Sequence, residues 1–282
     1  MIAFFAAHSK LIEQIGINCI LALSLSICLQ AGQLALAQAA FMGVGGYAGA
    51  ILAARYHQSL GVCLIAGAIS AAITAALIAF PVQRLRGVFL AIATIGVGEI
   101  ARVVEVNLNV TGGAEGFSGI PDDANIVSIM LVLLVCFLAV YALRGGRRSP
   151  NALTRRWSLA INATREDEAA ARGVGIDTGA VRFWTLVAGG AVAGLAGVLY
   201  GHSNFFIAPQ DFGFGRMEAI LVYCVIGGAG DAVGAVAGAL LLTLLPEIFR
   251  FLHDYRDVTN GVILLAVVIF APRGISGLWA KR

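Results

Sequence analysis

The sequence predicts an all-α polytopic inner-membrane protein with eight to ten transmembrane helices. The first observation is composition: 59% of the 282 residues are hydrophobic, only 12% are charged, and the mean hydropathy is +0.88. The second is a series of apolar runs close to the ~20 residues that a helix needs to cross a bilayer. The third is that these runs are continuously apolar, whereas the strands of an outer-membrane barrel alternate. Because backbone groups in lipid must pair internally, we expect helices.

The apolar runs define one membrane domain, residues 1–282, with nine candidate spans. In chain order these are residues 12–31, 34–54, 60–80, 87–106, 125–143, 183–202, 216–229, 233–249 and 258–271. The second and seventh are rich in glycine or polar residues, so we expect a broken or re-entrant segment at either place. The first run is long and weakly basic at its start, which favours a retained span over a cleaved signal peptide. Glycines also recur at four-residue spacing, a packing signal that serves helix contacts within the chain or with a partner subunit.

Basic residues predict the orientation of the domain. The loop at residues 144–182 contains eight of the chain's arginines, and such an excess marks a cytoplasmic loop. Counting spans from this loop also places the C-terminus in the cytoplasm. Two loops on the opposite side, residues 109–121 and 203–215, contain glycine, proline and aromatic residues. They are expected to be either structured entrances for a solute or ordinary turns.

The stretch NATREDEAAARGVGID, residues 162–177, is a compact charged island in this apolar chain. We expect a short helix with Thr164 as its N-cap and three acidic residues complementing the positive end of its dipole. Alanines favour the helix and Gly175 offers a stop. The island is either a docking segment for a partner or an ordinary solvated connection.

The sequence contains none of the familiar motifs for nucleotide binding, hydrolysis or metal binding. Only Lys10 and Lys281 are present as lysines, and neither follows a glycine-rich phosphate loop. Protease and hydrolase motifs are missing too, so an enzyme is not expected. The five cysteines form no CxxC pair and the four histidines lie far apart, so no metal site is expected. A net charge of +3 is too small to suggest nucleic acid.

Polar residues inside the apolar runs are candidates for a solute path or for helix contacts. They are Gln33, Gln38, Glu99 and Arg102. The last two are three residues apart on one helix and are spaced to form an ion pair, with Glu105 one turn further on. In the glycine-rich loop, Thr111, Gly112 and Gly113 are candidates for an external vestibule, because free backbone groups can meet a carboxylate there.

Six motifs occur in an order that resembles the permease subunit of bacterial branched-chain amino-acid ATP-binding-cassette importers. They are GQLALAQAAFMGVGGYAGA (32–50), RLRGVFLAIATIGVGEIAR (84–102), VTGGAEGFSGIP (110–121), ATREDEAAARGVGI (163–176), GGAGDAVGAVAGA (227–239) and APRGISG (271–277). Each glycine-rich motif alone is weak, whereas the ordered set is specific. Two departures concern the cargo and docking: Arg216 stands where a small polar residue is expected, and Gly234-Ala235 where Gly-Pro is expected.

The resemblance implies a bacterial inner-membrane subunit that pairs with a second, related permease. It also implies two cytoplasmic ATPase subunits that bind ATP and Mg²⁺, a periplasmic solute-binding protein, and no cofactor on this chain. The resemblance makes the charged island the ATPase-coupling segment, with Arg165, Glu166, Asp167, Glu168, Ala170 and Gly175 as its residues. Leucine, isoleucine and valine are the expected cargo. The alternatives are a permease of the same family for urea, short amides or other amino acids and, in a different class, an ion-driven secondary transporter.

Overall fold

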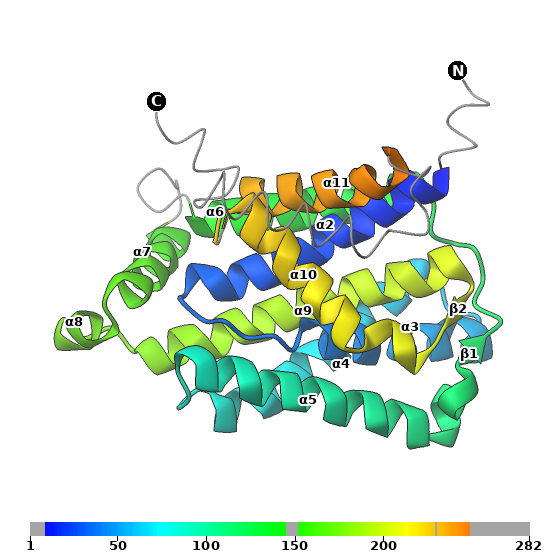
Figure 1. The fold of residues 1–282 in the computed structure, drawn as a ribbon, viewed down its shortest axis with the longest axis horizontal. Coiled ribbons are helices and arrows are strands. Elements are labelled where there is room, and N and C mark those ends of the chain that lie inside the picture. The colour runs from blue at the N-terminus through cyan, green and yellow to red at the C-terminus, as the bar shows by residue number, and fades with distance from the viewer. Residues whose placement is uncertain (1–8, 145–151, 229, 249–282) are drawn as a thin grey trace.

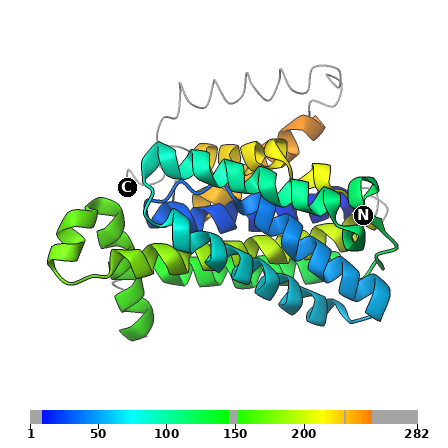
Figure 2. The same ribbon diagram turned by 90° about the horizontal axis from the view of Figure 1, so that it is seen from below.

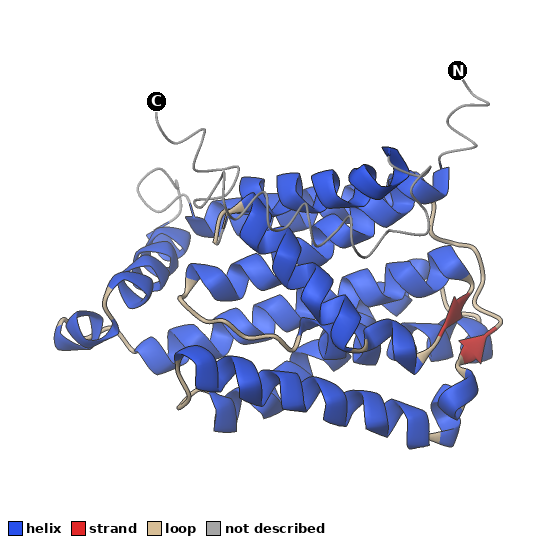
Figure 3. Ribbon diagram, in the orientation of Figure 1, coloured by secondary structure: helices blue, strands red, loops and turns tan. Residues whose placement is uncertain are grey.

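A computed structural model describes residues 9–144, 152–228 and 230–248, which are almost entirely helical (Figures 1 and 3). Eight described helices form the bundle: α2 (Ser9–Gln30), α3 (Gln38–Tyr56), α4 (Leu60–Val82), α5 (Gly87–Asn107), α6 (Ile126–Arg144), α9 (Thr178–Asn204), α10 (Phe214–Gly227) and α11 (Ala232–Ile248). Two further helices, α7 (Ala152–Glu166) and α8 (Glu168–Gly173), lie between α6 and α9. Three 3₁₀ turns follow α5 and α9: η1 (Asn109–Thr111), η2 (Gly113–Glu115) and η3 (Pro209–Phe212).

Five helices of the described part are long and apolar enough to cross a membrane: α2, α4, α5, α6 and α9. A sixth span results if α10 and α11, which meet at an angle of 119°, are counted as one bent unit. Helix α3 is not among them, since Gln38, Arg55 and several glycines lower its hydropathy. The all-α, multi-pass class is therefore confirmed. The count of eight to ten spans stays a prediction, and the candidate span 258–271 lies outside the described residues.

The bundle has two distinct ends. Helices α7 and α8 project at one end, with α8 furthest from the long helices (Figures 1 and 2). At the opposite end, β1 (Phe117–Ser118) pairs with β2 (Phe206–Ile207) in an antiparallel two-stranded sheet. We call these the α8 end and the β end. The two loops expected on one side of the membrane, 109–121 and 203–215, thus meet at the β end.

Glycines bring α3, α4 and α9 into close contact at the centre. A β-carbon placed on Gly197 of α9 would collide with the carbonyl oxygen of Met42 on α3. One placed on Gly45 would collide with Gly194, and one on Gly194 would collide with the carbonyl oxygen of Gly67 on α4. Without side chains at these positions the backbones can approach closely, which is how helices associate in lipid. The four-residue glycine spacing of α3 and α9 therefore serves packing within this chain.

Helix α4 has two stripes of opposite character. Its buried stripe consists of small residues at every fourth position: Cys63, Gly67, Ala71, Ala75 and Ala79. Large aliphatic residues on the other side are more than half exposed: Ile65, Ile69, Ile73 and Leu77. In a water-soluble protein the large aliphatic side chains would be buried instead of exposed. In a bilayer it is favourable, because lipid solvates the large side chains and the small ones permit contact with α9.

The chain is non-helical at two places inside the bundle. Residues 31–37 leave the end of α2 and run back along the helices before α3 begins at Gln38 (Figure 3). Most of this segment is buried, and the Leu36 N–H donates to Thr94 Oγ1 of α5 at 2.8 Å. The second break separates α10 from α11, with Gly228 and Gly230 both at positive φ. The first break lies where the first and second candidate spans meet, and the second lies where the seventh and eighth meet, while α3 and α10 are each continuous helices. Non-helical backbone at this depth must be buried in protein or line a cavity.

Candidate functional site

Helix α8 begins at Asp167, which caps it. The Asp167 Oδ1 atom accepts hydrogen bonds from the N–H groups of Ala169 at 2.8 Å and Ala170 at 3.0 Å. Thr164 is therefore not the cap that the sequence suggested. It lies inside α7, where its hydroxyl donates to the Ala160 carbonyl at 2.8 Å. The charged island is thus divided, with Arg165 and Glu166 ending α7 and Glu168 beginning α8.

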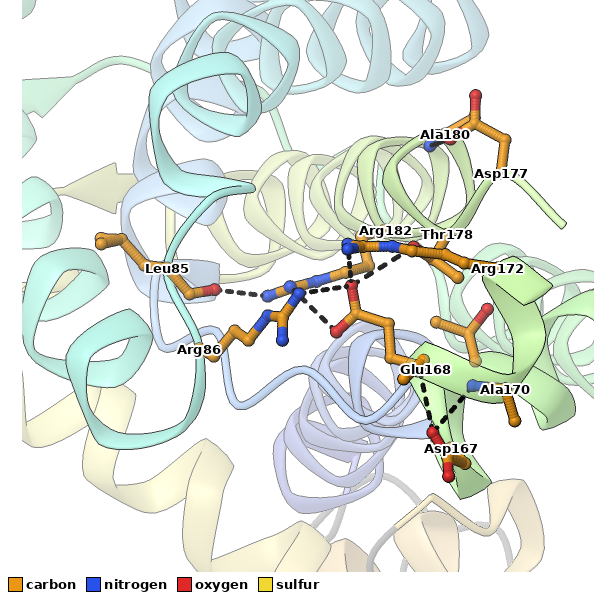
Figure 4. Close-up of polar contacts among 12 residues, drawn as sticks. Leu85, Arg86, Asp167, Glu168, Ala170, Arg172, Asp177, Thr178, Ala180 and Arg182 are labelled. Atoms are coloured by element: carbon orange, nitrogen blue, oxygen red, sulfur yellow. Dashed lines mark hydrogen bonds and ion pairs between the residues drawn. The ribbon is translucent and has the colours of Figure 1, made fainter. Parts of the chain in front are cut away.

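Glu168 joins α8 to two other parts of the chain (Figure 4). Its Oε1 atom contacts Arg172 of the same helix, lies 3.3 Å from Arg86 Nη2 before α5, and accepts from Thr178 Oγ1 of α9 at 3.2 Å. Its Oε2 atom lies 3.8 Å from Arg182 Nη1, also on α9.

The arginines around Glu168 are themselves fixed. Arg182 is buried and donates to the Leu85 carbonyl at 2.6 Å, and the Arg172 Nε atom donates to Thr178 Oγ1 at 2.8 Å. One carboxylate therefore holds three guanidinium groups from three segments, and this cluster determines how α8 sits on the bundle.

Arg165 lies against both breaks in the bundle. A β-carbon on Gly32, at the start of the first non-helical segment, would be 3.5 Å from the Arg165 Cα atom. A β-carbon on Gly230, in the break between α10 and α11, would be 2.8 Å from Arg165 Nη1. The end of α7 therefore touches the backbone at each place where the bundle lacks helical hydrogen bonds.

Helix α7 rests on the bundle while α8 faces away from it. Ile161 of α7 packs with Ala31 and Val181 in a small cluster of its own, and Trp157 packs beside it. On α8 and the turn after it, Ala171 is buried whereas Ala169, Ala170, Gly173 and Val174 are exposed, Val174 by 77%. Gly175 follows at φ +85° and turns the chain toward α9. The exposed residues Ala169, Ala170, Gly173 and Val174 thus form a small, mainly apolar surface at the α8 end, which we call the α8 knuckle.

The polar residues expected along a solute path lie in two different settings. Gln33 donates to Thr185 Oγ1 of α9 at 3.1 Å, and Gln38 donates to Cys28 Sγ of α2 at 3.3 Å. Both are buried, and their bonds tie the first break to its neighbours. Glu99 and Arg102 form the expected ion pair at 2.9 Å, with about a third or more of each side chain exposed on α5. They lie on the outer surface of this chain and not in its core.

The expected vestibule residues lie at the β end. Thr111 is buried, and its hydroxyl donates to the carbonyl oxygens of Glu105 and Leu108, each at 2.6 Å. Gly112 and Gly113 follow at φ +81° and +63°, which a side chain would strain. The glycine-rich loop is thus tied back onto the end of α5 and is not an open turn.

Three charged residues have a place in the structure that their sequence context did not reveal. Arg86 and Arg182 surround Glu168, and Glu105 is buried at the far end of α5. Arg86 and Arg182 each follow or begin an apolar run, and this is a weak signal because most helix ends carry such residues. In the described residues, no group of three or more histidine, cysteine, aspartate or glutamate side chains is placed to hold a metal ion. The α8 end thus combines a capped short helix with ion pairs that join α8, α9 and the start of α5.

Comparison with known proteins identifies the family of the chain. The family model described as branched-chain amino acid transport system / permease component matches residues 8–272. The permease protein LivM of the high-affinity branched-chain amino acid transport system of Escherichia coli K12 is 29% identical over 93% of this chain and 66% of its own length. LivH of the same organism is 33% identical over 60% of this chain and 52% of its own length. The autoinducer 2 import system permease protein LsrC of Yersinia enterocolitica is 27% identical over 64% of this chain and 52% of its own length.

These matches extend over most of the described helices. The chain spans about two thirds of the length of LivM. No solved structure matches it. The family model covers both breaks, the Glu168 cluster and the β end. The chain belongs to the family of permease components of branched-chain amino acid transport systems.

Proposed function

We propose that the chain is the permease subunit of an ATP-binding-cassette importer for branched-chain amino acids. In this proposal it lies in the bacterial inner membrane and pairs with a second, related permease. Two cytoplasmic ATPases bind ATP and Mg²⁺, and a periplasmic binding protein delivers the solute. This chain binds no cofactor. The α8 end and the C-terminus are then cytoplasmic, and the β end faces the periplasm.

The observation that carries the proposal is the position of the α7–α8 junction. Arg165 touches both non-helical breaks, and Glu168 two residues after α7 binds α9 and the start of α5. A partner that presses on the exposed side of α8 would therefore act on both non-helical breaks, on α9 and on the start of α5. Arginine-rich loops face the cytoplasm, where ATP is available. With only two lysines and no phosphate loop, the chain depends on a partner for nucleotide.

The β end suits delivery of a zwitterion. Both charges of an amino acid make passage through lipid costly, so an importer must offer polar contacts. The loops paired through Phe117 and Ile207 form a structured surface on which a solute-binding protein can dock. The relatives LivM and LivH are named for branched-chain amino acids and LsrC for autoinducer 2, so the same fold serves chemically different cargo. The branched-chain assignment rests on the longer match to LivM.

Reconstitution tests the proposal. The complete transporter in liposomes is expected to accumulate leucine only with ATP and the binding protein, and isoleucine and valine should compete whereas urea should not. Competition by urea in place of the amino acids would change the cargo to short amides. Accumulation by this chain alone, driven by an ion gradient without nucleotide, would overturn the importer and favour a secondary transporter.

A further inference from the structure

Glu105 is a buried carboxylate with no hydrogen-bonded counter-ion among the described residues. It lies two residues before the end of α5, where the helix leads into the β end (Figure 1). Its exposed fraction is 5%, and neither carboxylate oxygen has a hydrogen-bond partner among the described residues. The arginine one turn earlier, Arg102, is bound to Glu99 at 2.9 Å. A buried carboxylate of this kind is costly and marks a functional site inside a membrane domain.

An aromatic cluster lies beside this carboxylate. Gly43 of α3 makes room for it, since a β-carbon there would collide with Glu105 Oε1 and lie 3.0 Å from the Phe212 ring. One turn along α3, the Tyr47 ring packs edge-on against Phe212 with centroids 5.8 Å apart. Tyr200 packs on Phe212 in the same manner at 6.2 Å. Phe212 thus lies beside the carboxylate, and the Tyr47 and Tyr200 rings pack on Phe212.

A second orphaned polar atom lies in the same cluster. The Tyr47 hydroxyl is buried and has no hydrogen-bond partner among the described residues. Tyr47 lies one turn along α3 from Gly43, where an added β-carbon would collide with Glu105 Oε1. The carboxylate can only accept hydrogen bonds, whereas the phenol hydroxyl can donate or accept, and neither group has a hydrogen-bond partner among the described residues.

The chemistry of these groups selects an ammonium ion. A primary ammonium carries a positive charge and three N–H donors, which a carboxylate and a hydroxyl accept. Aromatic faces attract the same cation through their quadrupole. A divalent metal would require six or more oxygen ligands, far more than this cluster offers.

We propose that Glu105 and Tyr47 bind the ammonium group of the cargo as it enters the membrane domain from the β end. The inference rests on the proposed function for the identity of the cargo as an amino acid. Glu105 lies next to the β end, because Thr111 Oγ1 of the glycine-rich loop donates to the Glu105 carbonyl oxygen at 2.6 Å. This position agrees with entry of the cargo from the β end. Beyond that loop lies the β1–β2 pairing.

The test uses the complete transporter in lipid nanodiscs without the binding protein. Radiolabelled 3-methylbutylamine is the ammonium probe, and 4-methylpentanoate, with the same branched chain and a carboxylate, is the control ligand. Glu105→Gln is expected to weaken binding of the amine tenfold or more, and Tyr47→Phe about threefold, because charge-assisted hydrogen bonds contribute more than neutral ones. Binding of the acid should not change. Glu115→Gln, an exposed carboxylate at the same end, is the matched control variant and should bind both probes as wild type does.

Two results would overturn the assignment. One is a wild-type complex that does not bind the amine, and the other is amine affinity within twofold of wild type in both variants. Where Glu105→Gln does not assemble, Tyr47→Phe decides, since it keeps the ring and removes only the hydroxyl. Leucine uptake separates this proposal from the importer itself. If amine binding depends on Glu105 but ATP does not drive leucine uptake, the importer is rejected and the site is kept. If leucine uptake is normal and both variants bind the amine as wild type does, the site is rejected and the importer is kept.

Discussion

Glu168 is the residue whose replacement most directly tests how α8 is held. Glu168→Gln removes the negative charge and keeps the shape, so three arginines lose their shared partner. Glu168→Lys adds a fourth positive charge to the cluster. We expect both variants to insert and to assemble, because the glycine contacts of α3, α4 and α9 are unaffected. We expect α8 to detach from the bundle and coupling to fall.

The magnitude follows from the exposure of each partner. The side chains of Arg86 and Arg172 are 60% and 55% exposed, so each pair contributes about 0.5 kcal/mol. Arg182 is 6% exposed, and loss of its charged partner costs about 1–3 kcal/mol while its bond to Leu85 persists. The Arg172 pair lies within α8 and persists when α8 detaches, so the pairs that hold α8 to the bundle total about 1.5–3.5 kcal/mol. Since 1.4 kcal/mol is a factor of ten, the detached population should rise by about tenfold or more.

The assay is leucine uptake and ATP hydrolysis measured on the same proteoliposomes of the complete transporter. We expect Glu168→Gln to lower leucine transported per ATP at least fivefold, and Glu168→Lys to lower it further, with basal hydrolysis retained. Glu115→Gln, an exposed carboxylate at the opposite end, is the control and should behave as wild type. Wild-type uptake and ATP use in Glu168→Lys would refute the coupling role of the cluster.

Three further outcomes are expected. Asp167→Ala removes the α8 cap, a loss of about 1 kcal/mol, so the α8 amides should exchange with solvent about fivefold faster by mass spectrometry; unchanged exchange would argue against the cap. Gly197→Ala forces a β-carbon into the α3 backbone and should lower the Tm of the purified transporter by several degrees, while Gly96→Ala, with open space on α5, should leave it unchanged. Ser118→Cys with Phe206→Cys should form a disulfide on oxidation, seen as a gel shift, because these residues are cross-strand partners; failure to cross-link would contradict the pairing of the two loops.

Composition and span length were enough to predict the helical membrane class, and four-residue glycine spacing correctly indicated close packing. The reason is that both are local properties that lipid makes decisive. The exposed aliphatic stripe of α4 can be predicted from the sequence in the same way, once the solvent is known to be lipid. A break within the second or seventh span was expected from their polar and glycine-rich residues, but α3 and α10 are each continuous and the non-helical residues near Gly32 and Gly230 lie at the span junctions.

Other features depend on contacts that the sequence does not announce. Thr164 and Asp167 are both suitable caps, and the choice is made by α7, whose Ile161 packs on Ala31 and Val181 and so extends the helix past Thr164. Glu168 and Arg86 are 82 residues apart, and no periodicity links them. Glu105 seemed a mere extension of the Glu99 pair until α3 and η3 were seen to enclose it. Long-range pairing is decided by tertiary packing and not by local pattern.

Helix α9 offers a physical route between the two ends. Its first turn is bound to the α8 cluster through Thr178 and Arg182, and β2 follows directly after its last residue, Asn204. At 1.5 Å per residue its 27 residues extend about 40 Å, longer than the hydrocarbon core of a bilayer. A straight helix with tight glycine contacts moves as a unit, whereas the breaks beside Arg165 have no helical hydrogen bonds to lose. Pressure on the α8 knuckle should therefore shift α9 as a lever and bend the chain at the breaks, so that the β end and Glu105 respond to events in the cytoplasm.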